Sequence, residues 1–71
     1  MIADIRKQLA RVPFIPFSIR TSDGFVYAVP TVDRAYVTPN GHRVVVSDDD
    51  DSVAILTPLH ISGVVGQDAS A

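Results

Sequence analysis

The 71-residue chain has no cysteine, no glutamate and no apolar run long enough to cross a membrane. Without cysteine, disulfides and thiolate zinc sites are excluded. The longest uninterrupted apolar run covers residues 25–29, far short of the ~20 residues that a membrane-spanning helix needs. Charged residues interrupt the apolar ones at positions 2–7, so no signal sequence is expected. These absences predict a cytoplasmic protein without a membrane partner.

Sequence signals of enzymatic chemistry are also missing. The chain has no cysteine nucleophile, no Gly-x-Ser-x-Gly turn and no glycine-rich phosphate loop. No glutamate is present to act as a general acid, and so short a chain has little interior for a substrate pocket. We therefore expect a protein that is not an enzyme and that needs no cofactor.

The composition is that of a small globular domain. Hydrophobic residues make up 46% of the chain, charged residues 20%, and the formal net charge is −2, which differs from the pattern of disordered chains. Domains of this size usually depend on disulfides, a metal or oligomerisation for stability. Because cysteine is absent, a homo-oligomer is the first of these to expect, and a tightly packed monomer is the alternative.

The balance of residue types favours β-structure. Eleven valines and six isoleucines stand against three leucines, and β-branched side chains suit a pleated sheet. All eight acidic residues are aspartates, which favour turns and helix caps over helix interiors. The chain is therefore predicted to be mostly β, with many turns.

One segment has a helical pattern. Ile2, Ile5, Leu9 and Val12 form an apolar stripe at helical spacing, and Pro13 disfavours helical geometry at the residue before it. The spacing predicts a helix over residues 3–10. We expect its stripe to cover the open end or face of a β-barrel.

Alternating apolar and polar residues predict up to six short strands after the helix. Asp23-Gly24 indicates a hairpin turn, and Pro39-Asn40-Gly41 indicates another. The four aspartates at 48–51 are expected in a solvated loop. The predicted strands cover residues 17–22, 25–29, 35–38, 43–47, 53–57 and 59–65.

These elements predict an N-terminal helix followed by a small antiparallel barrel of five or six strands, of the SH3-like or Sm-like kind. Residues 1–66 would form a single domain, and residues 67–71 a flexible tail. Phe25, Tyr27 and Val29 share one face of their strand and are expected in the core. If the strand at 43–47 lies at an edge, Val45→Pro should abolish association.

Two resemblances extend this interpretation. Residues 11–19, Asp23-Gly24 and Val29-Pro30 resemble a group of short, uncharacterised bacterial proteins with a Pro-Phe-x-Pro-Phe-x-Ile strand. That resemblance covers residues 2–65 and implies no activity.

More distantly, the chain is similar to the Sm-like RNA chaperone Hfq. The similar segments are residues 16–19, with Gly24 after them, and residues 61–65. This resemblance implies a ring of about six subunits that binds single-stranded RNA. Hfq carries a Lys-His pair before its last strand, whereas here the segment is Pro58-Leu59-His60, so the RNA site does not transfer residue by residue.

Five residues are candidates for contact with RNA or a protein partner. Arg34 and Tyr36 lie together near a proline, His60 precedes the last strand, and Arg20 and Arg43 could join a basic face in a ring. Arginines can contact phosphates, and a tyrosine can stack on a base. Each also has a structural interpretation: solvated strand arginines, a core tyrosine and a turn histidine with local hydrogen bonds.

The acidic run at 48–51 suggests calcium, because Asp48, Asp50 and Ser52 have the spacing of the first EF-hand ligands. Val53 and Leu59 stand at the positions that need glycine and glutamate, so we predict no metal site.

The favoured function is a non-enzymatic interaction module that associates with itself or with an unknown protein partner. The alternative is an Sm-like ring that binds single-stranded RNA.

Overall fold

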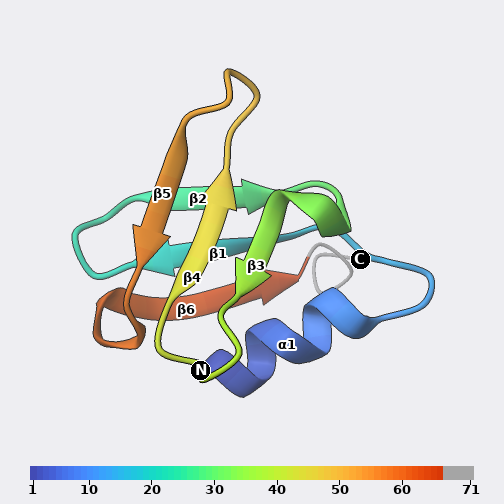
Figure 1. Cartoon of the computed structure of the whole chain (residues 1–71), viewed down its shortest axis with the longest axis horizontal. Helices are drawn as coiled ribbons and strands as arrows, with labels where there is room; N and C mark the ends of the chain where they lie inside the picture. Colours follow the sequence, from blue (N-terminus) through green and yellow to red (C-terminus); the bar gives the residue numbers. More distant parts are fainter. Residues whose placement is uncertain (67–71) are drawn as a thin grey trace.

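The computed structural model describes residues 1–66 as one helix and six strands in two antiparallel sheets. The predicted flexible tail at 67–71 lies outside the described residues. Helix α1 covers Ile2–Ala10 (Figure 1). The strands are β1 (Phe17–Thr21), β2 (Val26–Val29), β3 (Ala35–Val37), β4 (Val44–Ser47), β5 (Val53–Leu56) and β6 (Ile61–Gly66). Two short 3-10 turns, η1 (Val32–Arg34) and η2 (Pro58–His60), precede β3 and β6. The mostly β prediction is confirmed.

The strands form two three-stranded sheets, with the orders β2-β1-β6 and β3-β4-β5. The two sheets cross face to face, with β3-β4-β5 in front in Figure 1. Within residues 1–66 no strand of one sheet pairs with a strand of the other, so the predicted closed barrel is not found. Pro30, which has no backbone N–H, and η1 separate β2 from β3. The chain therefore changes sheet at this point instead of running one bent strand through both sheets.

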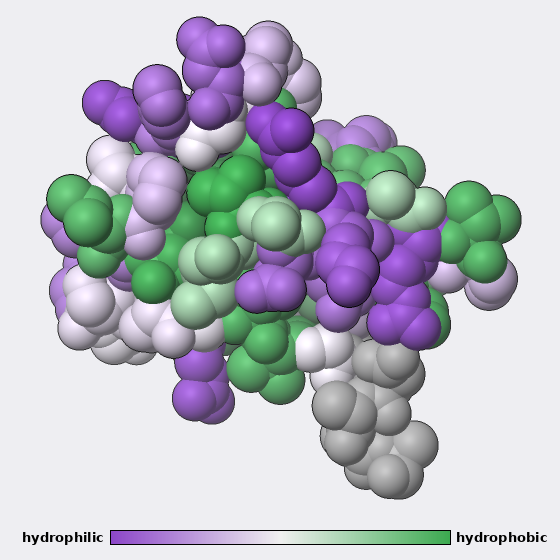
Figure 2. All heavy atoms as spheres, turned by 90° about the horizontal axis from the view of Figure 1, so that it is seen from below, coloured by the Kyte–Doolittle hydropathy of each residue, from purple (hydrophilic) through white to green (hydrophobic). Residues whose placement is uncertain are grey.

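Helix α1 closes one of the open corners between the sheets. It packs against β3 and β6, which are edge strands of different sheets (Figure 1). Ile5 is 0% exposed, and Ile2 and Leu9 pack against the core around it. The predicted stripe is wrong at Val12, which is 95% exposed because the helix ends at Ala10 and the chain becomes extended at Arg11. The outer side of α1 is polar, and a band of hydrophilic residues crosses this face in Figure 2.

The core lies between the inner faces of the two sheets. It contains alternate residues of strands β1 to β5, because successive side chains point to opposite faces, whereas β6 pairs with a shift in register. Its largest fully buried side chains are Ile5, Phe17, Ile19, Val29 and Val44. Phe14 packs against this core from the loop after α1, with its ring centroid 6.1 Å from that of Phe17.

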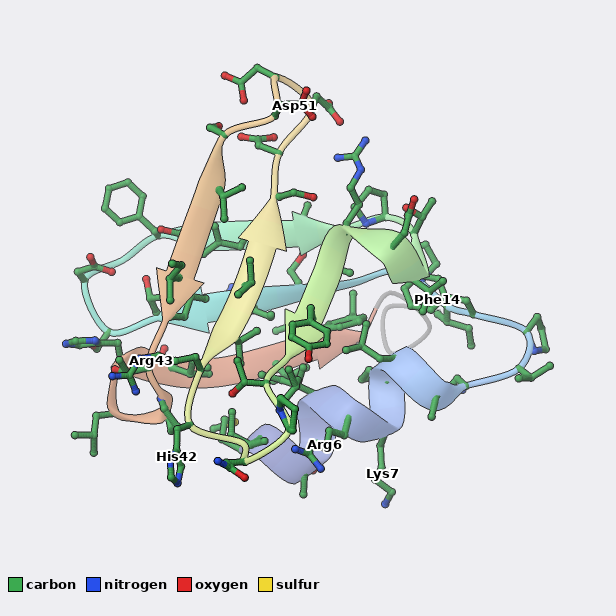
Figure 3. The ribbon with its side chains drawn as sticks, viewed as in Figure 1. Arg6, Lys7, Phe14, His42, Arg43 and Asp51 are labelled. Atoms are coloured by element: carbon green, nitrogen blue, oxygen red, sulfur yellow. The ribbon has the colours of Figure 1, made fainter. Side chains whose placement is uncertain are left out.

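Both predicted turns are present. Gly24 has φ +92° in the β1–β2 hairpin, and its N–H donates to the Thr21 carbonyl. Gly41 has φ +74°, and its N–H donates to the Thr38 carbonyl over 2.8 Å. These are left-handed conformations that favour glycine. In Figure 3 the Arg6 side chain reaches from α1 toward the second turn, where Nη2 donates to the Thr38 and Pro39 carbonyls.

Several predicted boundaries and burials need correction. The last strand begins at Ile61 rather than at residue 59, because residues 58–60 form η2, and it includes Gly66. Phe25 precedes β2 and is 61% exposed, whereas Tyr27 is partly buried against the core and Val29 fully buried. Strand β4 is the centre of its sheet and not an edge. Val45→Pro would therefore disrupt a central strand and would not test an edge interface.

Candidate functional site

The structure separates the two strongest sequence candidates, Arg34 and Tyr36. Arg34 Nη2 lies 2.7 Å from Oδ1 of Asp49 in the acidic loop. A hydrogen bond from the guanidinium to Asp49, assisted by the negative charge, raises the pKa of Arg34 above its ordinary value. Tyr36 is on β3 and faces a different, shallow depression beside Arg6 and Leu9 of α1. The two side chains therefore do not form one site.

Tyr36 is also not a core residue. Its side chain is 55% exposed, so the core interpretation is wrong. The neighbouring residues Ala35 and Val37 take the inward positions of β3, and alternation places Tyr36 on the outer face. This exposure leaves an aromatic ring available for contact with a partner.

The remaining three candidates are exposed and lie on separate elements. His60 is in η2, with Nδ1 2.8 Å from Thr57 Oγ1, as its structural interpretation expected. Arg20 is on β1, facing away from the core. Arg43 precedes β4 and donates from Nη1 to the His42 carbonyl over 2.7 Å, and Figure 3 shows both residues beside the turn that leads into β4. Among residues 1–66 no hydrogen bond or ion pair joins these three to one another.

Sequence reasoning missed a contiguous apolar row on the outer face of the β3-β4-β5 sheet. The strand register places Tyr36 opposite Val45 and Val45 opposite Ile55. Ile55 is 66% exposed, and Val53, on the same face of β5, is 58% exposed. We call Tyr36, Val45, Ile55 and Val53 the outer apolar row. The sequence does not predict this row, because the alternation of residues along a strand does not indicate whether a partly apolar outer face will be exposed or packed against another element.

Two residues of the outer apolar row, Val53 and Ile55, also lie on the free edge of β5. Asp48 N–H donates to the Ser52 carbonyl, which makes that pair hydrogen-bonded. Hydrogen-bonded and non-bonded pairs alternate along an antiparallel ladder, so the pair Ala54–Val46 is bonded, whereas Val53 and Ile55 lie at non-bonded positions. The backbone N–H and C=O groups of Val53 and Ile55 therefore point away from β4, where no strand of the described residues pairs with them.

A second free edge belongs to β2. Thr21 N–H donates to the Phe25 carbonyl, so the same alternation makes Tyr27 and Val29 the hydrogen-bonded partners of β1. The backbone groups of Val26 and Ala28 point away from β1. Both of these residues also have exposed side chains.

A hollow of about 320 Å³ lies beside this β2 edge. One wall is β2, and the other is the β4–β5 hairpin, which projects beyond β2 in Figure 1. This is the open corner between β2 and β5, opposite the corner that α1 closes. The lining residues are Val26, Tyr27, Ala28, Pro30, Arg34, Val46, Ser47, Asp48, Asp49, Ser52, Val53 and Ala54.

The acidic loop at 48–51 is an exposed hairpin loop, as predicted, and its polar groups also form hydrogen bonds with one another. The Asp48 carboxylate accepts from the Asp49 N–H, and the Asp50 carboxylate accepts from the N–H and hydroxyl of Ser52. The Ser52 hydroxyl is the main cause that lowers the pKa of Asp50. Asp51 takes a positive φ of 68° at the tip, which Figure 3 shows pointing away from the sheets. In the described part of the chain no three acidic, histidine or cysteine side chains gather to hold a metal.

Two other aspartates have pKa values lowered by neighbouring hydroxyl groups. The Thr21 hydroxyl donates to Asp23 and is the main cause of its lowered pKa, to which nearby His60 adds a smaller attraction. The Thr31 hydroxyl acts in the same way on Asp33. Both carboxylates accept hydrogen bonds within turns beside β2.

Comparison of the chain with protein-family models, curated proteins and solved structures finds no match. The resemblances to short bacterial proteins and to Hfq therefore stay predictions. In residues 1–66 no helix has the length and apolar character required to cross a membrane.

Proposed function

We propose that this chain is a non-enzymatic interaction module that associates with a second copy of itself through the free edge of β5. The observation that carries the proposal is that Val53 and Ile55 each combine unpaired backbone groups with an exposed apolar side chain. We also propose that the two sheets are related to an SH3-like or Sm-like barrel whose β2–β5 corner is open.

Strand pairing at this edge would provide hydrogen-bond partners for the backbone of β5 and cover its exposed apolar side chains. A second β5 strand would supply partners for the backbone groups of Val53 and Ile55. Its side chains would extend the outer apolar row across the new sheet and remove apolar surface from water. Contiguous exposed apolar side chains of this kind are typical of protein interfaces.

The acidic loop favours one orientation of the two copies. Each β5 strand begins beside a loop that carries four aspartates, one of which is paired with Arg34 of η1. Parallel pairing would place two such loops side by side, with like charges close together. Antiparallel pairing places them at opposite ends, so we propose a two-fold symmetric dimer.

Light scattering after size exclusion, with the wild type and Ile55→Lys, tests this proposal. The wild type should elute with the mass of two subunits, and Ile55→Lys with the mass of one, because a charged side chain at the edge opposes strand pairing. Val12→Lys is the matched control, since Val12 is 95% exposed outside any strand. The proposal is wrong if Ile55→Lys keeps the wild-type mass with an unchanged circular dichroism spectrum.

The ring-forming, RNA-binding alternative has one specific observation in its favour, the exposed ring of Tyr36. The pairing of Arg34 with Asp49 weighs against it, because that cation is already neutralised. A mass of six or seven subunits, with retention of a labelled single-stranded RNA at low salt, would favour this alternative. In that case Arg34→Ala should weaken retention and reduce its salt dependence.

A further inference from the structure

We propose a second binding site, in which the hollow between β2 and the β4–β5 hairpin takes an extended peptide segment with a basic side chain. The segment would add as a strand to the free edge of β2. This site goes beyond self-association at β5, uses a different strand edge and does not depend on the dimer.

The backbone of β2 supplies the first part of the site. The N–H and C=O groups of Val26 and Ala28 point away from β1, and no hydrogen bond within residues 1–66 uses them. An extended chain laid along this edge can accept from both N–H groups and donate to both carbonyls. Recognition by strand addition obtains its affinity from such main-chain bonds and its specificity from side-chain pockets.

The hollow supplies space and an apolar wall. Its volume of about 320 Å³ is at the small end of the range for binding pockets, which suits a short stretch of extended chain and not a helix. Val46, Val53 and Ala54 of the hairpin lie across from β2. A small apolar side chain from the added strand would contact them.

The charge of the lining selects the partner. The charged residues that line the hollow are two acidic ones, Asp48 and Asp49, and one basic one, Arg34. The guanidinium of Arg34 is already paired with Asp49. Asp50 and Asp51 extend the negative charge along the same loop. A lysine or arginine on the incoming segment complements this charge, whereas an acidic side chain meets repulsion.

The test titrates ¹⁵N-labelled protein with acetyl-Lys-Val-Thr-Val-Lys-amide and, separately, with acetyl-Glu-Val-Thr-Val-Glu-amide, following amide chemical shifts. The basic peptide should shift the amides of Val26 and Ala28 most strongly. It should bind at least about fivefold more tightly than the acidic peptide at low salt, and this ratio should fall toward one as salt screens the charges. Absence of binding at millimolar peptide, or shifts centred elsewhere, would overturn the proposal.

Two variants separate the backbone from the charge contribution. Ala28→Pro removes an N–H that points away from β1, so it should abolish peptide binding while the fold is retained. The double variant Asp48→Asn with Asp49→Asn keeps the loop's acceptor oxygens but removes the two carboxylates that line the hollow beside Arg34. It should lose or reverse the preference for the basic peptide, and an unchanged preference would contradict the charge argument.

The two free edges serve as controls for each other. Ile55→Lys should leave peptide binding at β2 unchanged, and Ala28→Pro should leave the mass of the dimer unchanged. A monomeric wild type that binds the basic peptide would refute self-association and support the β2 site. If Ala28→Pro instead lowers the mass of the assembly, a second copy occupies the β2 edge and the peptide proposal is wrong.

Discussion

Trimming Ile5 should show how much the fold depends on docking of α1. Ile5 is the only fully buried residue of the helix, and it meets core residues from both sheets. Ile→Val in a core typically costs 0.5–1.5 kcal/mol and Ile→Ala 2–5 kcal/mol, so we expect about 1 kcal/mol for Ile5→Val and about 3 kcal/mol for Ile5→Ala. A domain of 71 residues has a stability of roughly 4–10 kcal/mol, so the larger loss is about 30–75% of the total.

Urea unfolding followed by circular dichroism measures both losses. With a slope of about 1 kcal/mol per molar urea, Ile5→Val should lower the midpoint by about 1 M, and Ile5→Ala by about 3 M. Val12→Ala is the control and should leave the midpoint within a few tenths molar of the wild type, because Val12 is 95% exposed. Equal midpoints for Ile5→Ala and the wild type would refute the conclusion that α1 closes the core.

Three further changes test the turns and the buried polar groups. Gly24→Ala should cost about 1–2 kcal/mol of stability, because φ is +92° at this residue. An added Cβ would contact no other atom, so the backbone conformation alone opposes the change. Gly63→Ala is the control: its Cβ would also be free of contacts but φ is ordinary, so it should be neutral or stabilising in the same urea assay. The Thr21 hydroxyl lowers the pKa of Asp23 in the folded state, so its stabilisation is present above the ordinary carboxyl pKa of about 3.9 and disappears as the pH falls below it. Asp23→Asn should therefore lower the urea midpoint at pH 7 and flatten its decline between about pH 5 and pH 2, and a parallel decline would contradict this assignment. Gln8→Met should raise the free energy of unfolding by about 1 kcal/mol, because within residues 1–66 the buried Oε1 of Gln8 has no hydrogen-bond partner. A loss of stability would show that this oxygen is satisfied in solution.

Much of the fold could be predicted because strong local signals agree with the final structure. Gly24 and Gly41 mark turns at which the backbone takes positive φ, and the alternation around Ile19 gives the buried face of β1. Pro13 gives the end of the helix to within a few residues. These signals depend on neighbours in the chain, which is why the sequence alone conveys them.

The arrangement of the strands could not be predicted in the same way. Whether β4 lies at the centre or the edge of its sheet depends on pairing between distant residues, such as Val45 with both Tyr36 and Ile55. The separation into two sheets follows Pro30 and η1, which divide β2 of one sheet from β3 of the other. A Pro interrupting the strand was visible in the sequence, but the resulting absence of pairing between the sheets was not.

The candidate site was the least predictable part. Arg34 could be identified as a candidate cation, yet its pairing with Asp49 joins residues from loops that only the fold brings together. The free backbone groups of Val26 and Ala28 leave no mark on residue type, because every non-proline residue carries them. Only the register of β1 with β2 shows which of these groups lack a partner.

The mass of the wild-type protein in solution, measured by light scattering after size exclusion at low and high salt, tests the central claim most directly. Pairing through the β5 edge predicts the mass of two subunits at both salt concentrations, because main-chain hydrogen bonds and apolar burial are little affected by screening. The mass of a single subunit at both, at protein concentrations up to about 1 mM, would contradict self-association through this edge.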